Sequence, residues 1–85
     1  MANPAWEAYV SERAGDPERA EAGYLRTWNR ALTAGKGYGA LKVWALQGLV
    51  RTGRRLEHDY SARMAEQQLT ALRQAPRYSG RRKEK

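Results

Sequence analysis

The feature that most restricts the fold is a pair of helix-start signals near the N-terminus, separated by a helix-stop signal. Asn3-Pro4 and Asp16-Pro17 each place a capping residue directly before a proline, which is the order favoured at the first turn of an α-helix. Gly15 stands between them, where a left-handed residue would end the first helix. The pattern predicts two helices, over 4–14 and 17–34.

The rest of the chain is also rich in helix formers. Its 85 residues include 14 Ala and 8 Leu, against three Val and no Ile or Phe, and this composition favours helix over strand. Gly53 interrupts the later helical pattern and Pro76 ends it. We predict an all-α bundle of three to four helices, in which 40–52 and 53–75 form either two helices or one bent helix. Residues 1–75 then form one domain, followed by a flexible basic tail, 76–85.

Charge is distributed unevenly along the chain. The formal net charge is +7, and residues 23–56 carry seven bases and no acid. A solvated helix face usually mixes both signs, whereas this stretch contains no acid that could pair at i,i+4. Arg outnumbers Lys there, and the planar guanidinium suits phosphate oxygens. We predict a polyanion-binding track that the tail extends, formed by Arg19, Arg26, Arg30, Lys36, Arg51, Arg54, Arg55, Arg77, Arg81, Arg82 and Lys83.

The stretch from Gly35 to Gly39 reads GKGYG, which raises the question of a phosphate-binding loop. A P-loop follows a strand and places Ser or Thr directly after its lysine, but here a helix precedes and Gly37 follows Lys36. We interpret the stretch as a hinge between two helices. The alternative is a loop whose amides and side chains touch one backbone phosphate. Two tyrosines without apolar neighbours are candidates for stacking on bases: Tyr38 and Tyr78.

Residues suited to catalysis are scarce. The chain has no Cys and one His, His58, which stands between Glu57 and Asp59. Adjacent helical side chains point about 100° apart, so these three cannot converge on one metal or substrate. We expect no catalytic residue, no metal, no cofactor and no small-molecule substrate. No apolar run approaches the roughly 20 residues that span a bilayer, and no signal peptide is recognisable. We therefore expect a cytoplasmic protein that does not bind membranes.

The charge pattern favours a non-catalytic small subunit that binds the phosphate backbone of nucleic acid, largely without sequence preference. The predicted setting is a larger nucleoprotein assembly, in which single-stranded DNA or RNA and other protein subunits are the partners. The sequence does not distinguish DNA from RNA.

An apolar segment supports a different function. Residues 41–50 are apolar around most of the helix circumference, so the segment should lie between other helices or against another subunit. The alternative is therefore a helical protein–protein interaction module, an adaptor or inhibitor, that docks through this segment and a basic face onto an acidic partner. Trp and Arg are common at the centres of such interfaces. The candidate docking residues are Trp6, Trp44, Leu46 and Val50.

Overall fold

Helices make up most of the described part of the chain, which comprises residues 3–35 and 38–74 of a computed structural model. They are α1 (Pro4–Arg13), α2 (Pro17–Ala34), α3 (Gly39–Arg55) and α4 (Asp59–Gln74). The prediction of an all-α fold is confirmed, and the described residues form four helices. The predicted basic tail, 76–85, lies outside the described residues, as does Lys36.

Both predicted N-caps are present. The Asn3 side chain accepts hydrogen bonds from the backbone N–H groups of Ala5 and Trp6, at 2.9 and 3.5 Å. The Asp16 side chain accepts one from the Arg19 N–H at 3.2 Å. Each bond satisfies a backbone donor that has no partner inside the helix, which is why these residues begin α1 and α2.

The boundary between α3 and α4 differs from the predicted one. α3 continues through Gly53 to Arg55, and the chain turns at Leu56 to His58. The His58 N–H donates to the Gly53 carbonyl at 2.7 Å, and the Glu57 N–H donates to Arg54 at 3.1 Å. This pair of bonds is a Schellman motif, whose left-handed position is filled by Glu57 with φ 60°. Gly53 therefore does not break the helix.

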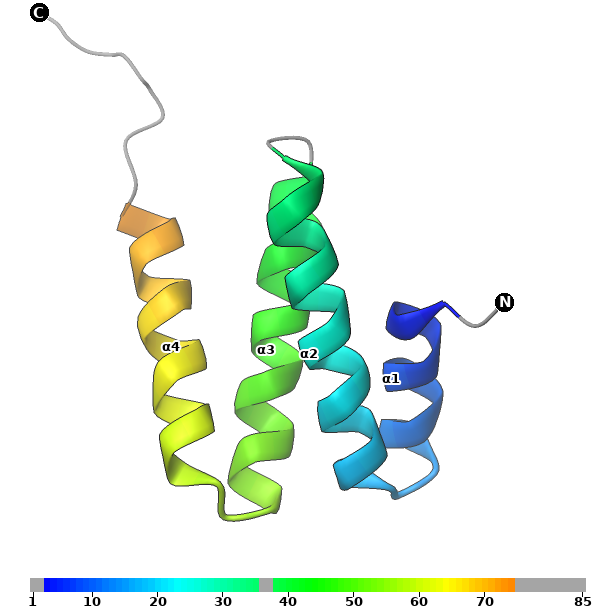
Figure 1. The fold of residues 1–85 in the computed structure, drawn as a ribbon. Helices are drawn as coiled ribbons and strands as arrows, with labels where there is room; N and C mark the ends of the chain where they lie inside the picture. Colours follow the sequence, from blue (N-terminus) through cyan, green and yellow to red (C-terminus); the bar gives the residue numbers. More distant parts are fainter. Residues whose placement is uncertain (1–2, 36–37, 75–85) are drawn as a thin grey trace, which may run out of the picture.

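The four helices lie side by side in the order of the chain, and each runs antiparallel to the next (Figure 1). The main packing contacts join consecutive helices, so α1 packs on α2 and α4 packs on α3. α3 thus lies between α2 and α4, as predicted for the apolar segment 41–50. The arrangement is an open row, in which the two outer helices each pack on one neighbour.

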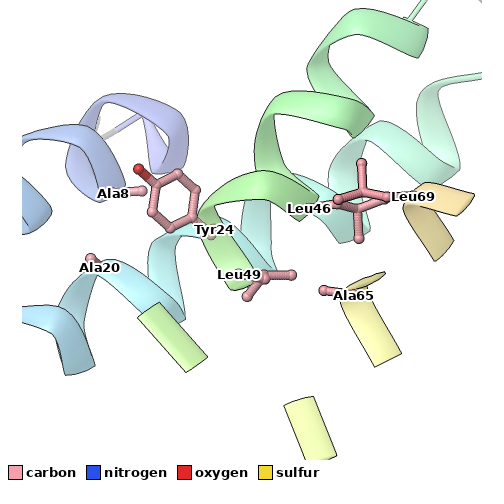
Figure 2. Packing of buried hydrophobic residues seen from close by; sticks show 7 residues of the cluster. All are labelled: Ala8, Ala20, Tyr24, Leu46, Leu49, Ala65 and Leu69. Atoms are coloured by element: carbon pink, nitrogen blue, oxygen red, sulfur yellow. The ribbon is translucent and has the colours of Figure 1, made fainter. Parts of the chain in front are cut away.

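The buried apolar side chains form one continuous cluster made of two groups, shown in Figure 2. One centres on Tyr24, which is fully buried among α1, α2 and α3 and packs near Ala8 and Ala20. The second lies between α3 and α4 and contains small and medium aliphatic residues: Leu46, Leu49, Ala65 and Leu69. Trp44 joins the first group, with its ring centroid 5.0 Å from that of Tyr24.

Each helix–helix contact includes a glycine. A Cβ on Gly23 would lie 2.9 Å from the Ala8 Cβ, and one on Gly48 would overlap the Tyr24 ring. At Gly53 the same atom would lie 3.2 Å from the Ala62 Cβ. The absence of a side chain at these positions allows neighbouring helices to pack closely. This close approach explains why Gly53 is retained inside α3.

Candidate nucleic-acid interface

Three arginines of the predicted track form ion pairs with acids that lie far away in the sequence. Arg26 Nη2 is 3.1 Å from Glu7 Oε1, and Arg54 pairs with Glu66. Arg51 makes a two-pronged contact with Glu12, in which Nε and Nη2 each donate to one carboxylate oxygen at 2.9 Å. The premise that the middle bases lack acidic partners within the chain is wrong for these three.

The Arg51–Glu12 pair belongs to a network that includes the buried Tyr24. The Tyr24 hydroxyl donates to Glu12, and Arg51 Nη2 donates to the same hydroxyl at 3.1 Å. The hydrogen bonds from Arg51 hold the pKa of Glu12 below its usual value, although partial burial opposes this. Burial and the bond to Glu12 raise the pKa of Tyr24 to about 12. Arg51 therefore joins α3 to α1 across α2, and its contacts are structural.

The lone histidine also has a local partner. His58 Nδ1 lies 3.1 Å from both carboxylate oxygens of Glu21, and this contact joins the turn before α4 to α2. Within residues 3–35 and 38–74, no group of three or more His, Asp or Glu side chains is placed to hold a metal ion. The contact is thus an inter-helix link.

Six bases of the described residues form no ion pair within that part of the chain and no cation–π contact. They divide between the two ends of the helix row. Arg19, Arg55 and Arg63 lie near the start of α2, the end of α3 and the start of α4, which share one end of the row (Figure 1). Arg30, Lys42 and Arg73 lie near the opposite ends of the same helices. Of the predicted track, Arg19 and Arg55 therefore lie at one end of the row and Arg30 at the other, while Lys42, Arg63 and Arg73 were not predicted as site residues.

We call the second group, Arg30, Lys42 and Arg73, the basic end. No acid occurs in the last turns of α2 and α4 or in the first turn of α3. The acids of the described part lie at the opposite end or near mid-helix: Glu7, Glu12, Asp16, Glu18, Glu21, Glu57, Asp59 and Glu66. The positive charges at this end are therefore little neutralised by neighbouring acids, and they produce a positive electrostatic potential in the surrounding solvent.

A groove of about 420 Å³ opens beside the basic end, between α1, α2 and α3. Arg30, Tyr38 and Leu41 line it, together with the start of α1. Tyr38 is 46% exposed, and as the N-cap residue of α3 it makes no side-chain capping bond. A guanidinium, an aromatic ring and the N-terminal turn of α3 thus face one space. Sequence reasoning named Arg30 and Tyr38 but did not place them together.

The candidate docking residues lie in different environments. Leu46 is buried beneath α4, while Trp44 and Val50 are partly buried against the core, because α2 and α4 flank α3 on both sides. Trp6 is 64% exposed and stacks on Tyr9, with the ring centroids 5.8 Å apart. Of the four, Trp6 alone presents most of its surface to solvent.

Known protein families, curated proteins and solved structures contain no match to this chain. Within the described residues, none of the helices has the length and apolar character needed to cross a bilayer.

Proposed function

We propose that this is a non-catalytic protein that binds nucleic acid through phosphate contacts at the basic end. The observation that carries the proposal is the separation of charge along the helix row: Arg30, Lys42 and Arg73 share an end that holds no acid in the described part of the chain. The phosphate backbone of nucleic acid is a polyanion, and Arg and Lys commonly bind it by such sequence-independent contacts.

The groove beside Arg30 suggests how a strand would bind. Arg30 would hold a phosphate by its planar fork, and Tyr38, on the same groove, would stack on an unpaired base. The backbone N–H groups in the first turn of α3 add donors with a favourable helix dipole. Because stacking needs an accessible base, this geometry favours a single strand over a duplex. The three internal ion pairs exclude Arg26, Arg51 and Arg54 from the proposed contacts unless those pairs break.

Two triple variants with equal charge change test the proposal. One removes the basic end (Arg30→Gln, Lys42→Gln, Arg73→Gln), and the control removes bases at the opposite end (Arg13→Gln, Arg19→Gln, Arg55→Gln). Fluorescence anisotropy with labelled single-stranded DNA, single-stranded RNA and duplex DNA at several salt concentrations measures both affinity and its salt dependence.

Loss of three phosphate contacts should make the slope of log K against log salt shallower by about 2 for a single strand. The control variant should keep the wild-type slope and lose less affinity. Equal losses of affinity in both variants would mean that binding depends on net charge alone. That result would contradict the proposal that the basic end is the binding site. A wild-type protein whose affinity does not respond to salt would overturn nucleic-acid binding.

A protein-docking role is the second candidate, because α1 carries an exposed apolar patch. The patch is formed by Trp6, Tyr9 and Val10, of which Tyr9 and Val10 are each 43% exposed. Trp and Tyr are enriched at the centres of protein interfaces. Such a patch is compatible with nucleic-acid binding in a larger assembly, since it lies on the outer helix of the row, away from Lys42 and Arg73.

A further inference from the structure

A second groove, of about 440 Å³, lies between α2 and α4 and has no role in the proposed nucleic-acid site. Leu46 and Leu49 of α3 form its floor. Its walls carry larger apolar side chains from both flanking helices, namely Leu25, Trp28, Tyr60 and Met64. The groove is thus an extension of the core between α3 and α4 that no further helix of the described chain covers.

The apolar wall residues are unusually accessible. Tyr60 is 71% exposed, Leu25 is 49% exposed and Met64 is 39% exposed. Removing large apolar side chains from water is favourable, so the exposure of these three leaves stabilising burial unused in the single chain. A contiguous apolar groove of this kind is typical of a docking surface.

The charge of the groove restricts what it binds. The only charged side chains among its lining residues are Glu18 and Glu21, both on α2. Glu21 is already in contact with His58, whereas Glu18 forms no ion pair within the described residues. An acid-only lining is unexpected in a chain of net charge +7. The matching occupant is a helix that presents apolar side chains together with a base.

The α4 wall of the groove, together with the adjacent Arg63, has that composition. Tyr60, Arg63 and Met64 lie within one helical turn, and all three are exposed. Arg63 has no ion pair within the described residues. The same face of the molecule therefore carries both an acidic apolar groove and a basic apolar ridge.

We propose that the protein forms a two-fold symmetric homodimer, in which α4 of each copy inserts into the groove between α2 and α4 of the other. Tyr60 and Met64 of the second copy would pack on the exposed wall residues of the first, Leu25, Tyr60 and Met64, above the buried Leu46 and Leu49. α2 and α4 begin at the same end of the row (Figure 1), so an axis parallel to the helices brings Arg63 of the second copy level with Glu18 and Glu21. The same self-complementary patch then forms both sides of the interface, as a two-fold axis requires.

The open row explains what dimerisation adds. As the outer helix of the row, α4 packs mainly on α3, and insertion into a second copy would give it a further packing partner. Two rows stacked through this face form a double layer of helices, which buries apolar stripes that one layer leaves exposed.

Sedimentation equilibrium over a range of protein concentrations tests the dimer. A monomer has a mass of 9.7 kDa, and we expect wild-type protein to shift reversibly to twice that value as its concentration rises. Glu18→Arg and Arg63→Glu should each weaken dimerisation at least about ten-fold, because each places like charges together twice in the symmetric interface. The double variant should recover most of the loss, since the pair is restored with its signs exchanged.

Two further variants complete the test. Arg30→Glu reverses an exposed charge outside this groove and should leave the dimer unchanged, and Met64→Arg should abolish it. Helix content measured by circular dichroism shows that each variant remains folded. A protein that stays monomeric at all concentrations overturns the proposal, and so does a dimer that Met64→Arg and the charge reversals leave intact.

Discussion

The two halves of the helix row are held together in different ways. In the half formed by α1, α2 and α3, the Tyr24 ring fills the space above Gly48 and its hydroxyl joins the Glu12–Arg51 pair. In the half formed by α3 and α4, small aliphatic residues meet, and the ion pair between Arg54 and Glu66 is exposed on both sides. Packing in the first half depends on one specific arrangement of hydrogen-bonded side chains. Packing in the second half depends mainly on the apolar area that is buried.

This difference indicates where the molecule tolerates change. A satisfied polar network beside a fully buried ring restricts the helices to one spacing and one rotation. Aliphatic contacts permit small adjustments without loss of a bond. We therefore expect substitutions near Tyr24 to cost more stability than comparable ones between α3 and α4.

The largest effect is expected from Gly48→Ala. The added methyl group would overlap the Tyr24 ring, so α2 and α3 would have to separate, and this outweighs the gain of about 1 kcal/mol in helix propensity. We expect a net loss of about 1–3 kcal/mol in the free energy of unfolding. Urea denaturation at one fixed protein concentration measures it.

Gly53→Ala is the matched control in the other half. Its methyl group would lie 3.2 Å from the Ala62 Cβ, which is a tight contact that a small shift of α4 relieves. The helix-propensity gain offsets much of the remaining cost, so the change should stay within about 1 kcal/mol of zero. If Gly53→Ala proved as costly as Gly48→Ala, the two interfaces would be equally rigid.

The next effect concerns the ion pairs. Arg51→Gln leaves Glu12, whose side chain is 17% exposed, without its two-pronged partner, and should cost about 1–2 kcal/mol. Arg54→Gln removes a pair whose arginine side chain is 64% exposed, and should cost less than about 1 kcal/mol. Denaturation at neutral pH compares the two variants.

Acid titration identifies Glu12 as the source of that difference. Its pKa is lowered in the folded state, mainly by the hydrogen bonds from Arg51. The resulting stability is fully present above the unfolded value of 4.5 and is lost as the pH falls through the lowered pKa. Arg51→Gln should therefore flatten the acid limb of the stability curve below about pH 4.5. Parallel acid limbs for the wild type and Arg51→Gln would contradict the role given to Glu12.

The smallest effect is expected at the turn between α3 and α4. Glu57 occupies a left-handed conformation with φ 60°, which costs an L-residue about 1–2 kcal/mol. Glu57→Gly removes this strain but makes the unfolded chain more flexible, so a net gain of about 0.5–1 kcal/mol is expected in thermal denaturation. Gly15 fills the equivalent position after α1, with φ 82°, and Gly15→Ala should lose a similar amount.

The sequence predicted the helices well where local chemistry decides their ends. Asn3 and Asp16 act through bonds to residues two or three positions away, so their role is visible in the sequence. The sequence predicts a break or a bend at Gly53, whereas α3 continues through it, because the close approach of Gly53 to Ala62 depends on tertiary packing that the sequence does not show. The sequence does not predict the turn between α3 and α4, because Glu57 is an unusual residue for a left-handed position.

The candidate site was harder to predict, for a related reason. Arg51 and Glu12 are 39 residues apart, and no local spacing reveals that α1 and α3 approach each other across α2. A stretch of sequence without acids consequently lies beside acidic side chains that other helices contribute to the same surface. The grouping of Arg30, Lys42 and Arg73 at one end likewise depends on helix direction, which follows from the antiparallel order of the row.

That chain-ordered packing also bears on how the molecule assembles. Because each helix rests mainly on the one before it, most native contacts close short loops, and proteins of low contact order reach their folded state quickly. In the monomer, α4 can detach without disturbing Tyr24 or its hydroxyl bond, so at concentrations too low for dimerisation hydrogen exchange should be fastest in α4 and slowest in the middle of α2 and α3. The molecule would then unfold in steps, from its last helix inward.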